Sequence, residues 1–573
     1  DVESGRQRRL TGDGVAGERI NGKPDWVYWE EIFGRKSNGF WWSPSSTGIA
    51  FLQFDESGVT RHPLLADAGE PLPEVYSQPY PTAGGRNPGV RVGVADVAGG
   101  GVTWLEVEGG DDSYVARVRW TPAGEVAVLH LAREQDRLDL MICDPATGAC
   151  RRRLREERAT WVDVADDFEI LADGRLVWGS DRGGWRRLYL YGADGGDATA
   201  LTPEGLAVTQ LEAVDSERGL VYFSGHEQDP LGAKDRQLYR VPLAGGDTET
   251  LSGGEGWTEA QVAADGSGWV ISHSTSARAP RVTCVRSGRH PVPLPGAAPS
   301  AYRLSDLPQW RYLTLPGERE GLALPARILV PPDLDPVRRY PAIMYHYGGP
   351  ASQTIVDATS SRPARDLWLR RQAQRGYVVL NVDNEASSYF GKTGAERLHR
   401  RFGELELAGQ LAGVAYLRSL GYVDAGRIGL FGWSGGGANT LYSLLRSPAT
   451  WRAGVAGAPV TDWRLYDSIW TERYLDHPED NADGYRDSSP LTWADRLEDA
   501  LLLVHGTADD NVHPHNTVML SRELVAAGKT FEQAFYPDEK HGFGTRASRH
   551  FYERMEAFFD RELGAGSDAP EDE

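Results

Sequence analysis

The sequence predicts two fold classes in one chain, a β-propeller followed by an α/β domain with a mainly parallel, doubly wound sheet. Two observations support this prediction. Strand-like segments and glycine turns recur between about residues 40 and 300, and strand-like segments alternate with helical ones after about residue 305. The length of 573 residues also exceeds the roughly 250 to 300 residues that one hydrophobic core can serve.

The β-rich part repeats at a period close to that of a propeller blade. The turn glycines Gly124, Gly174, Gly219 and Gly266 lie 50, 45 and 47 residues apart. Gly48 marks an earlier copy, separated from Gly124 by an inserted loop. Unrelated β-hairpins are the alternative explanation. Because propellers carry four to eight blades and the chain opens inside a β-rich stretch, we expect its natural start and its leading blades to lie upstream.

We therefore expect three regions along the chain. Residues 1–304 form an eight-bladed propeller that is incomplete at its start, residues 305–565 form the α/β-hydrolase catalytic domain, and residues 566–573 form an acidic tail. The second region holds a strand that leads directly into a glycine-rich turn and a helix. Loops at the carboxyl ends of its parallel strands are expected to carry the site.

Composition excludes several classes of partner. A net charge of −21 argues against nucleic acid, which needs a basic face. No apolar run approaches the roughly 20 residues of a membrane span. Cys143, Cys150 and Cys284 are an odd set without CxxC spacing, so we expect neither a disulfide framework nor a zinc site. The histidines do not fall at ligand spacing with carboxylates, and we expect no metal and no cofactor.

One short motif predicts a nucleophile. Gly432-Trp433-Ser434-Gly435-Gly436 fits G-x-S-x-G, with an apolar strand before it and a helical segment after it. The turn is so sharp that its flanking positions need to be almost free of side chain. Ser434 is thereby presented at the top of the sheet. A serine hydroxyl needs a neighbouring base to become a good nucleophile.

The acid and the base are expected later in the chain, in the order Ser, Asp, His. Asp509 follows the apolar strand ALLLVHG and is the predicted acid, with Asp510 as the alternative. His541 follows the strand FEQAFY and is the predicted base. The histidines that remain as candidates after Asp509 are His513, His515, His541 and His550. Asp509 would fix the imidazole tautomer, and His541 would move the proton.

The oxyanion of the tetrahedral intermediate needs donors that are already in place. Loss of one such donor costs about 3 kcal/mol. The backbone N–H of Gly435 is the expected first donor. Tyr347, in HYGGP after an early strand, is the expected second, with a packed aromatic residue as the alternative.

These segments resemble a known family. HGTADDNVH, YDSIWTERY, GWSGGG and DEKHG, with DWVYWEEIF, WWSP and QPYPTAGGRNP far upstream, resemble dipeptidyl peptidase IV and its bacterial relatives in the prolyl oligopeptidase superfamily of serine peptidases. The resemblance covers nearly the whole chain. It implies that Ser434, Asp509 and His541 are the triad and that Tyr347 is an oxyanion donor.

The resemblance also implies how a peptide is held. Glu30 and Glu31 match the glutamate pair that binds the free α-ammonium group of the substrate, and Asn511 matches the amide that holds its penultimate carbonyl. Two carboxylates in a closed cavity are unfavourable until a cation joins them. The apolar pocket for the residue before the cut is matched by Val460, Trp463, Tyr474 and Val512.

The chain departs from the family pattern at three places. Gly435 and Trp470 stand where tyrosines are usual, and we expect Trp470 to fill part of the space over Gly435. Glu385 stands where an arginine is common. No residue matches the family's substrate-binding arginine, which lies in an earlier blade.

The predicted function is removal of N-terminal dipeptides, preferably with Pro or Ala second, through an acyl-enzyme. The alternatives are an oligopeptidase or acylaminoacyl peptidase of the same superfamily, and a non-catalytic propeller scaffold. The expected partners are peptides with a free N-terminus. The resemblance implies a homodimer and a periplasmic or secreted location, although a cytoplasmic one stays open.

Overall fold

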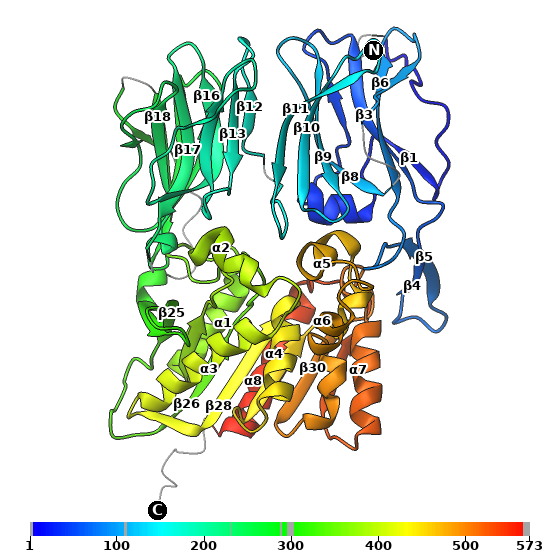
Figure 1. The fold of residues 1–573 in the computed structure, drawn as a ribbon. Coiled ribbons are helices and arrows are strands. Elements are labelled where there is room, and N and C mark those ends of the chain that lie inside the picture. Colours follow the sequence, from blue (N-terminus) through cyan, green and yellow to red (C-terminus); the bar gives the residue numbers. More distant parts are fainter. Residues whose placement is uncertain are drawn as a thin grey trace, which may run out of the picture.

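The computed structural model describes residues 4–107, 112–164, 166–229, 231–286, 289–294 and 303–564. The expected acidic tail, residues 566–573, lies outside these ranges. The expected boundary at 304/305 falls in a described short turn, Leu304–Asp306, and stays a prediction. β-Sheets occupy the upper half of the molecule, and an α/β part lies below them (Figure 1).

The upper part consists of antiparallel sheets that follow one another along the chain. The first pairs β1 (Arg19–Asn21), β2 (Phe40–Trp42), β3 (Gly48–Asp55), β6 (Gly89–Asp96) and β7 (Val102–Trp104). The second holds β8 (Ser113–Trp120), β9 (Val126–Ala132), β10 (Arg137–Cys143) and β11 (Cys150–Glu157). The third holds β12 (Phe168–Ile170), β13 (Leu176–Ser180), β14 (Arg187–Tyr191) and β15 (Thr199–Ala200). The fourth holds β16 (Leu206–Asp215), β17 (Leu220–Glu227), β18 (Gln237–Pro242) and β19 (Glu249–Thr250). The fifth holds β20 (Trp257–Val262), β21 (Gly268–Thr275), β22 (Arg278–Arg286) and β23 (Val292–Pro293).

Each predicted repeat, marked by a turn glycine, corresponds to one of these sheets. Gly124, Gly174, Gly219 and Gly266 each stand between the first two strands of one sheet, with φ between +60° and +85°. This left-handed region favours glycine, which explains why glycine recurs there. The described residues form five such sheets, and the expected eight blades remain a prediction.

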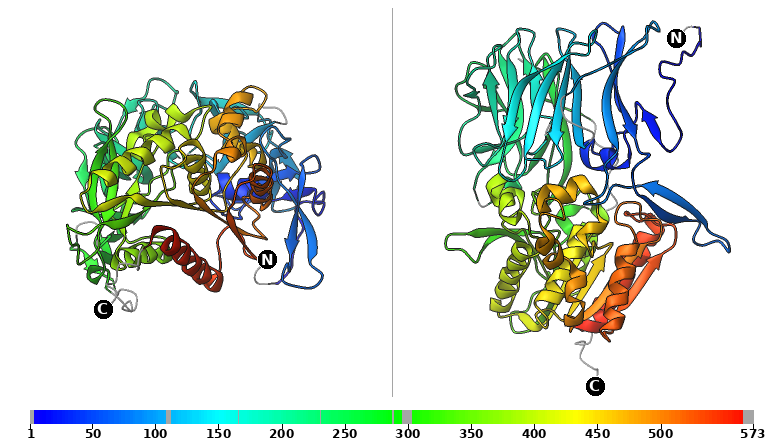
Figure 2. Two further views of the ribbon diagram at one scale, coloured as in Figure 1. Left: turned by 90° about the horizontal axis from the view of Figure 1, so that it is seen from below. Right: turned by 45° about the vertical axis from the view of Figure 1, so that its right-hand side comes forward.

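The inserted loop is a β-hairpin. β4 (Arg61–Ala66) pairs with β5 (Glu74–Pro79) between β3 and β6 of the first sheet. The hairpin projects from the side of the molecule, above helix α7 (His515–Ala526), in both side views (Figures 1 and 2). Gln78 at its end donates to the carbonyl of Asp510 at 3.1 Å, so the hairpin reaches the α/β part.

The sequence predicts no disulfide framework, and the described residues hold one disulfide that the sequence did not predict. Cys143 and Cys150 form a disulfide across the neighbouring strands β10 and β11. The register of these strands places the two residues directly opposite each other, as the last pair before the turn. The third cysteine, Cys284, is free.

The lower part is built on one eight-stranded sheet. Its order is β24-β25-β27-β26-β28-β29-β30-β31, with parallel pairing from β27 to β31. The strands are β24 (Arg311–Pro316), β25 (Ala323–Leu329), β26 (Tyr340–Tyr345), β27 (Val378–Val382), β28 (Val423–Trp433), β29 (Ala453–Gly457), β30 (Ala500–Gly506) and β31 (Glu532–Tyr536). The larger helices are α1 (Pro363–Gln374), α3 (Glu404–Ser419), α4 (Gly435–Arg446), α7 and α8 (Thr545–Leu563). The short ones are α2 (Gly391–Ala395), α5 (Ser468–Leu475) and α6 (Ala482–Asp487).

Helices cover both faces of this sheet. Leu417 of α3, Leu444 of α4 and Leu524 of α7 pack in the core on one face. Trp368 of α1 and Phe559 of α8 pack in a separate core on the other face. Seen from below, α8 lies across the sheet from α3 and α4 (Figure 2). This doubly wound arrangement directs the carboxyl ends of the parallel strands toward the propeller.

Buried ion pairs join the two parts. Arg133, after β9, makes two hydrogen bonds of 2.8 Å with Glu472 of α5, whose side chain is only 3% exposed. Lys392 of α2 donates to Asp163 at 2.8 Å, and Arg158 pairs with Glu396 at 2.6 Å. Removing one partner of such a buried pair costs about 3 to 5 kcal/mol, because a charge is left unpaired. The orientation of the propeller on the α/β part is therefore fixed by specific charges.

Candidate active site

Ser434 stands at the sharp turn between β28 and α4. Its backbone has φ 61° and ψ −123°, which is strained for a residue with a side chain. The neighbouring glycines make the turn possible. A Cβ on Gly432 would lie 2.0 Å from the carbonyl oxygen of Gly436, and a Cβ on Gly436 would lie 2.7 Å from that of His346. The sequence therefore folds here only if these two positions lack a side chain.

The structure brings Ser434, His541 and Asp509 into one hydrogen-bonded chain. Nε2 of His541 lies 2.9 Å from Oγ of Ser434, and Nδ1 lies 2.8 Å from Oδ2 of Asp509. Asp509 follows β30, His541 follows β31, and both come to the carboxyl edge of the sheet. The geometry allows His541 to accept the serine proton while Asp509 holds the ring.

Asp509 is fully buried and is held as a carboxylate. Its Oδ1 accepts the backbone N–H groups of Asn511 and Val512, each at 3.0 Å, and Nε2 of His505 lies 3.3 Å from Oδ2. Burial alone would raise the pKa of Asp509. The charge of His541 and the hydrogen bonds from His505 and His541 outweigh burial and hold this pKa well below its usual value.

The alternative acid Asp510 and the histidines His513 and His550 contact other side chains. Asp510 pairs with Lys540 at 2.7 Å. The ring of His513 stacks on that of His62, with 4.8 Å between centroids, and His550 contacts the hydroxyl of Tyr536. Among the predicted histidines, His541 is the one in contact with Ser434.

Tyr347 lies beside the start of α4. A Cβ on Gly435 would lie 3.5 Å from Cζ and 3.6 Å from Oη of Tyr347. Burial, and then the charge of Glu31, raises the pKa of Tyr347 to about 12, so the phenol keeps its proton at neutral pH and can donate it in a hydrogen bond.

The space over Gly435 lies next to Tyr347. The three atoms nearest to a Cβ at this position all belong to Tyr347. Trp470 stacks on Trp463, with ring centroids 5.1 Å apart and an angle of 21° between the rings. Gly435 and both tryptophans line the same cavity, and the expectation that Trp470 fills part of the space over Gly435 stays a prediction.

The two predicted glutamates come from a short helical turn, Tyr28–Ile32, at the lower edge of the propeller (Figure 1). Glu30 makes a bidentate ion pair with Arg35, at 2.7 and 2.8 Å, and accepts a hydrogen bond of 3.2 Å from Asn511. Glu31 accepts a hydrogen bond of 3.3 Å from the hydroxyl of Tyr466. Both carboxylates line the pocket that holds Ser434.

Glu31 sits in an electrostatically unusual position. Burial raises its pKa to about 7, the charge of Arg473 opposes this, and Glu30 adds to it. Burial and the charge of Glu31 also raise the pKa of Asp467. These two acids cannot easily be ionised together without a cation beside them.

An apolar wall completes the site. Its buried members Val460, Trp463, Tyr474 and Val512 belong to one cluster, with Trp470 packed against it. Phe402 packs against three of these rings, at centroid distances of 4.7 to 6.0 Å. The cavity has a volume of about 310 Å³ and joins the serine, the carboxylates and this wall.

Sequence reasoning missed several residues of the site. Tyr466, Asp467 and Arg473 stand within or beside YDSIWTERY, so the motif was available as a signal. Arg35 and Arg362 carried no signal in the sequence, because their roles come from contacts that only the fold creates.

Within the described ranges, no group of three or more His, Cys, Asp or Glu side chains could hold a metal ion. The helices described there include none long and apolar enough to cross a membrane.

Known proteins share both parts of this architecture. Residues 1–280 match the dipeptidyl peptidase IV N-terminal region, and residues 366–566 match the prolyl oligopeptidase family. The crystal structure of Porphyromonas gingivalis dipeptidyl peptidase 4 is similar with a TM-score of 0.91 and 32% identity, over 98% of this chain and 79% of that chain. The chain belongs to the dipeptidyl peptidase IV group of the prolyl oligopeptidase family. This membership confirms the resemblance drawn from the motifs and the combination of a propeller with an α/β hydrolase.

Curated members of the group include longer proteins. A probable dipeptidyl-aminopeptidase B of Coccidioides posadasii is 30% identical over 96% of this chain, which spans 63% of that protein. A probable dipeptidyl peptidase 4 of Arthroderma benhamiae is 29% identical over 94% of this chain, which spans 72% of that protein.

The glycines around Ser434 permit a matched test of the turn. We predict that Gly436→Ala abolishes labelling of Ser434 by a fluorophosphonate probe, because its Cβ would meet the backbone of His346. Gly435→Ala should keep labelling within about two-fold, since its Cβ would make only ordinary contacts with Tyr347. Labelling is read by intact mass, and a melting curve shows whether each variant folds. Equal labelling of the two variants would contradict the steric account.

Proposed function

We propose that the chain is a serine exopeptidase that releases N-terminal dipeptides, with Pro or Ala preferred at the second position. Ser434 is the nucleophile, His541 the base, Asp509 its orienting acid, and Tyr347 and the N–H of Gly435 the oxyanion donors. The observation that carries the proposal is the placement of Glu30 and Glu31 in the same 310 Å³ cavity as Ser434. Carboxylates at a fixed reach from the nucleophile select substrates by the position of their free amine.

The reaction follows from the contacts of the site. Ser434 attacks the carbonyl of the second residue while His541 takes its proton, and the imidazolium then protonates the leaving amine. Asn511 offers its side-chain amide to the penultimate carbonyl. The apolar wall suits a compact ring or methyl group, because a rigid pyrrolidine loses little entropy when it is buried. A second cycle with water releases the dipeptide.

Binding of the substrate's α-ammonium group requires a rearrangement at Glu30. Arg35 is now paired with the Glu30 carboxylate, and 60% of the Arg35 side chain is exposed. Because most of the Arg35 side chain is exposed, it can turn into solvent when a substrate ammonium takes its place beside Glu30. Glu31 lies deeper and would gain its charge partner from the same ammonium.

Reporter peptides test this proposal directly. Gly-Pro anilide should be cleaved, N-acetyl-Gly-Pro anilide should not, and Ser434→Ala should abolish cleavage. Glu30→Gln and Glu31→Gln should each lower kcat/KM roughly 10- to 100-fold, as expected for loss of a hydrogen bond to a charged group. Glu204→Gln, whose side chain is 94% exposed on a propeller loop, is the matched control and should change nothing. Equal cleavage of the acetylated reporter would favour the oligopeptidase alternative.

The raised pKa of Glu31 gives a pH dependence. Because the pKa is about 7, Glu31 is mostly protonated below pH 7 and mostly a carboxylate above it. Binding of an ammonium needs the carboxylate, so it should tighten roughly ten-fold between about pH 5.5 and 7.5, where a terminal amine is still largely charged. Calorimetry of Gly-Pro anilide binding to the Ser434→Ala variant measures this without interference from catalysis by His541. A pH dependence that survives Glu31→Gln would exclude this group as its source.

We also propose that the protein is a homodimer. Large apolar residues are exposed on the β4–β5 hairpin and on α7, which lie on one side of the molecule (Figure 1). Leu72 is 87% exposed, Val75 68% and Val525 67%. Sedimentation velocity at micromolar concentration should show a dimer, which Leu72→Asp/Val75→Asp should split. Val337→Asp, also at an exposed position (86%), is the control and should remain dimeric. A monomeric native protein would refute this arrangement.

A periplasmic or secreted location is a further part of the proposal. The Cys143–Cys150 disulfide supports it, because such bonds persist mainly in oxidising compartments. Fractionation of the native cells would test the location, and a cytoplasmic pool with reduced cysteines would contradict it.

A further inference from the structure

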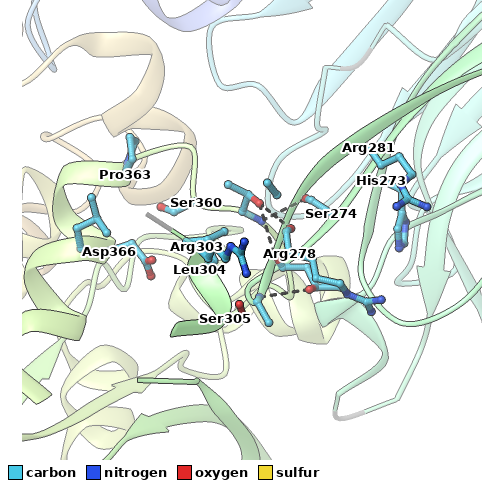
Figure 3. Close-up of a pocket in the computed structure, with 15 residues that line it drawn as sticks. His273, Ser274, Arg278, Arg281, Arg303, Leu304, Ser305, Ser360, Pro363 and Asp366 are labelled. Carbon is cyan, nitrogen blue, oxygen red and sulfur yellow. Dashed lines mark hydrogen bonds between the residues drawn. The ribbon is translucent and has the colours of Figure 1, made fainter. Parts of the chain in front are cut away.

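A second hollow lies at the junction of the fifth sheet and helix α1, outside the cavity of Ser434. Strands β21 and β22 with their turn form one wall, and the start of α1 with the segment before it forms the other (Figure 3). Its volume is about 620 Å³, within the range of small-molecule sites. We call it the junction pocket, and its polar lining consists of His273, Ser274, Thr275, Arg278, Arg281, Arg303, Ser305, Thr359, Ser360 and Asp366.

The junction pocket carries uncompensated positive charge. In the part of the chain that the structure describes, the guanidinium groups of Arg278, Arg281 and Arg303 have no hydrogen bond, ion pair or ring contact. Arg281 lies beside His273 on the sheet side of the pocket, and Arg303 lies between the sheet and α1 (Figure 3). Among the described residues, three guanidinium groups without a partner thus gather around one hollow in a chain of net charge −21.

The acidic groups at this pocket do not neutralise the arginines. Asp366 is the carboxylate in the lining, and it already accepts hydrogen bonds from Arg370 at 2.7 Å and from Trp310 at 3.0 Å. Asp306 lies next to the lining and accepts from Ser305 at 3.1 Å. The positive charge of the arginines is therefore open to a ligand.

Two hydroxyl groups of the lining are ready to donate. Oγ of Ser274 accepts the N–H of Thr359 at 3.2 Å, and Oγ of Ser360 accepts the N–H of Arg362 at 3.1 Å. Within the described residues neither hydroxyl has an acceptor for its own hydrogen. A ligand oxygen could thus receive these hydrogens in addition to those of the arginines.

We propose that the junction pocket binds a small anion with two or more negative charges, carried by carboxylate or phosphate groups. Arginine matches the geometry of both groups through paired N–H donors. Three guanidinium groups favour a multivalent ligand over a monovalent ion. The general field of this acidic chain repels anions, so binding depends on these local donors.

The junction pocket shares one segment with the cavity of Ser434. Thr359, Ser360 and Pro363 line the junction pocket, whereas Arg362 and Arg365 line the cavity of Ser434. An anion that contacts the start of α1 is therefore bound within a few residues of two arginines that line the cavity of Ser434. Such a ligand should alter the kinetics of the reaction at Ser434 without competing for the serine.

Calorimetry with the whole chain tests the proposal. Pyrophosphate and citrate serve as probes for the phosphate and the carboxylate source, with acetate as the monovalent comparison. We expect one site, and a Kd that rises roughly ten-fold or more in Arg278→Gln/Arg281→Gln/Arg303→Gln, because a hydrogen bond to a charged group contributes at least about this factor. Arg549→Gln, at an exposed position on α8, is the matched control and should leave the Kd unchanged.

The outcomes separate the possible sites. Equal affinity of the native chain and the triple variant would overturn the proposal, as would no binding of either probe. Loss of binding in Arg362→Gln but not in the triple variant would place the anion in the cavity of Ser434 and also overturn it. Preference for pyrophosphate or for citrate identifies the chemical source. Since calorimetry requires no turnover, failure of the peptidase proposal would leave this result readable.

Discussion

Asn511 joins the two parts of the molecule at the site. Its backbone N–H binds Asp509, and its carbonyl accepts the hydroxyl of Tyr80 from the propeller at 3.0 Å. Its side-chain amide donates to Glu30 and accepts from Tyr466 at 3.0 Å. A single buried residue therefore connects Asp509, the glutamate turn and the apolar wall. The spacing between Ser434 and the two glutamates depends on this set of bonds.

Buried charge keeps that spacing rigid. Glu472 accepts two hydrogen bonds from Arg133 and one of 2.7 Å from the N–H of Gly84. Such a carboxylate has no favourable place if the propeller moves away, because its donors all come from the propeller. Glu31 differs from Glu472, because it is buried without a full set of hydrogen-bond donors. Under the proposed function, a substrate cation would supply the missing partner of Glu31, whereas Glu472 already has its partners and holds the two parts together.

Sequence patterns predicted those features that depend on local chain geometry. The glycine turns of the sheets and the strand, turn and helix around Ser434 follow from short-range rules. The acid and the base were assigned from the order of segments along the chain, and their roles stay predictions. Glu30 and Glu31 could be singled out only through the family resemblance, because an isolated pair of glutamates is usually a surface feature. Their common cavity with Ser434 is a product of long-range packing.

Features that depend on pairing between distant or neighbouring strands escaped prediction. Cys143 and Cys150 lack the spacing of a disulfide framework, and only the register of β10 and β11 places them opposite each other. The stacking of Trp470 on Trp463 was not predicted, because it depends on the course of α5. Arg35 and the arginines of the junction pocket gave no pattern, since exposed arginines are common in any sequence.

The glycine motif also decides where this active site can diversify. Gly432 and Gly436 are fixed by backbone contacts, so a substitution there destroys the turn before any question of substrate arises. The atoms nearest to a Cβ at Gly435 are side-chain atoms of Tyr347, at 3.5 Å or more, so a methyl group fits at this position without displacing the backbone. The shape of the cavity can therefore change at Gly435, whereas the turn itself depends on its two neighbours in the motif.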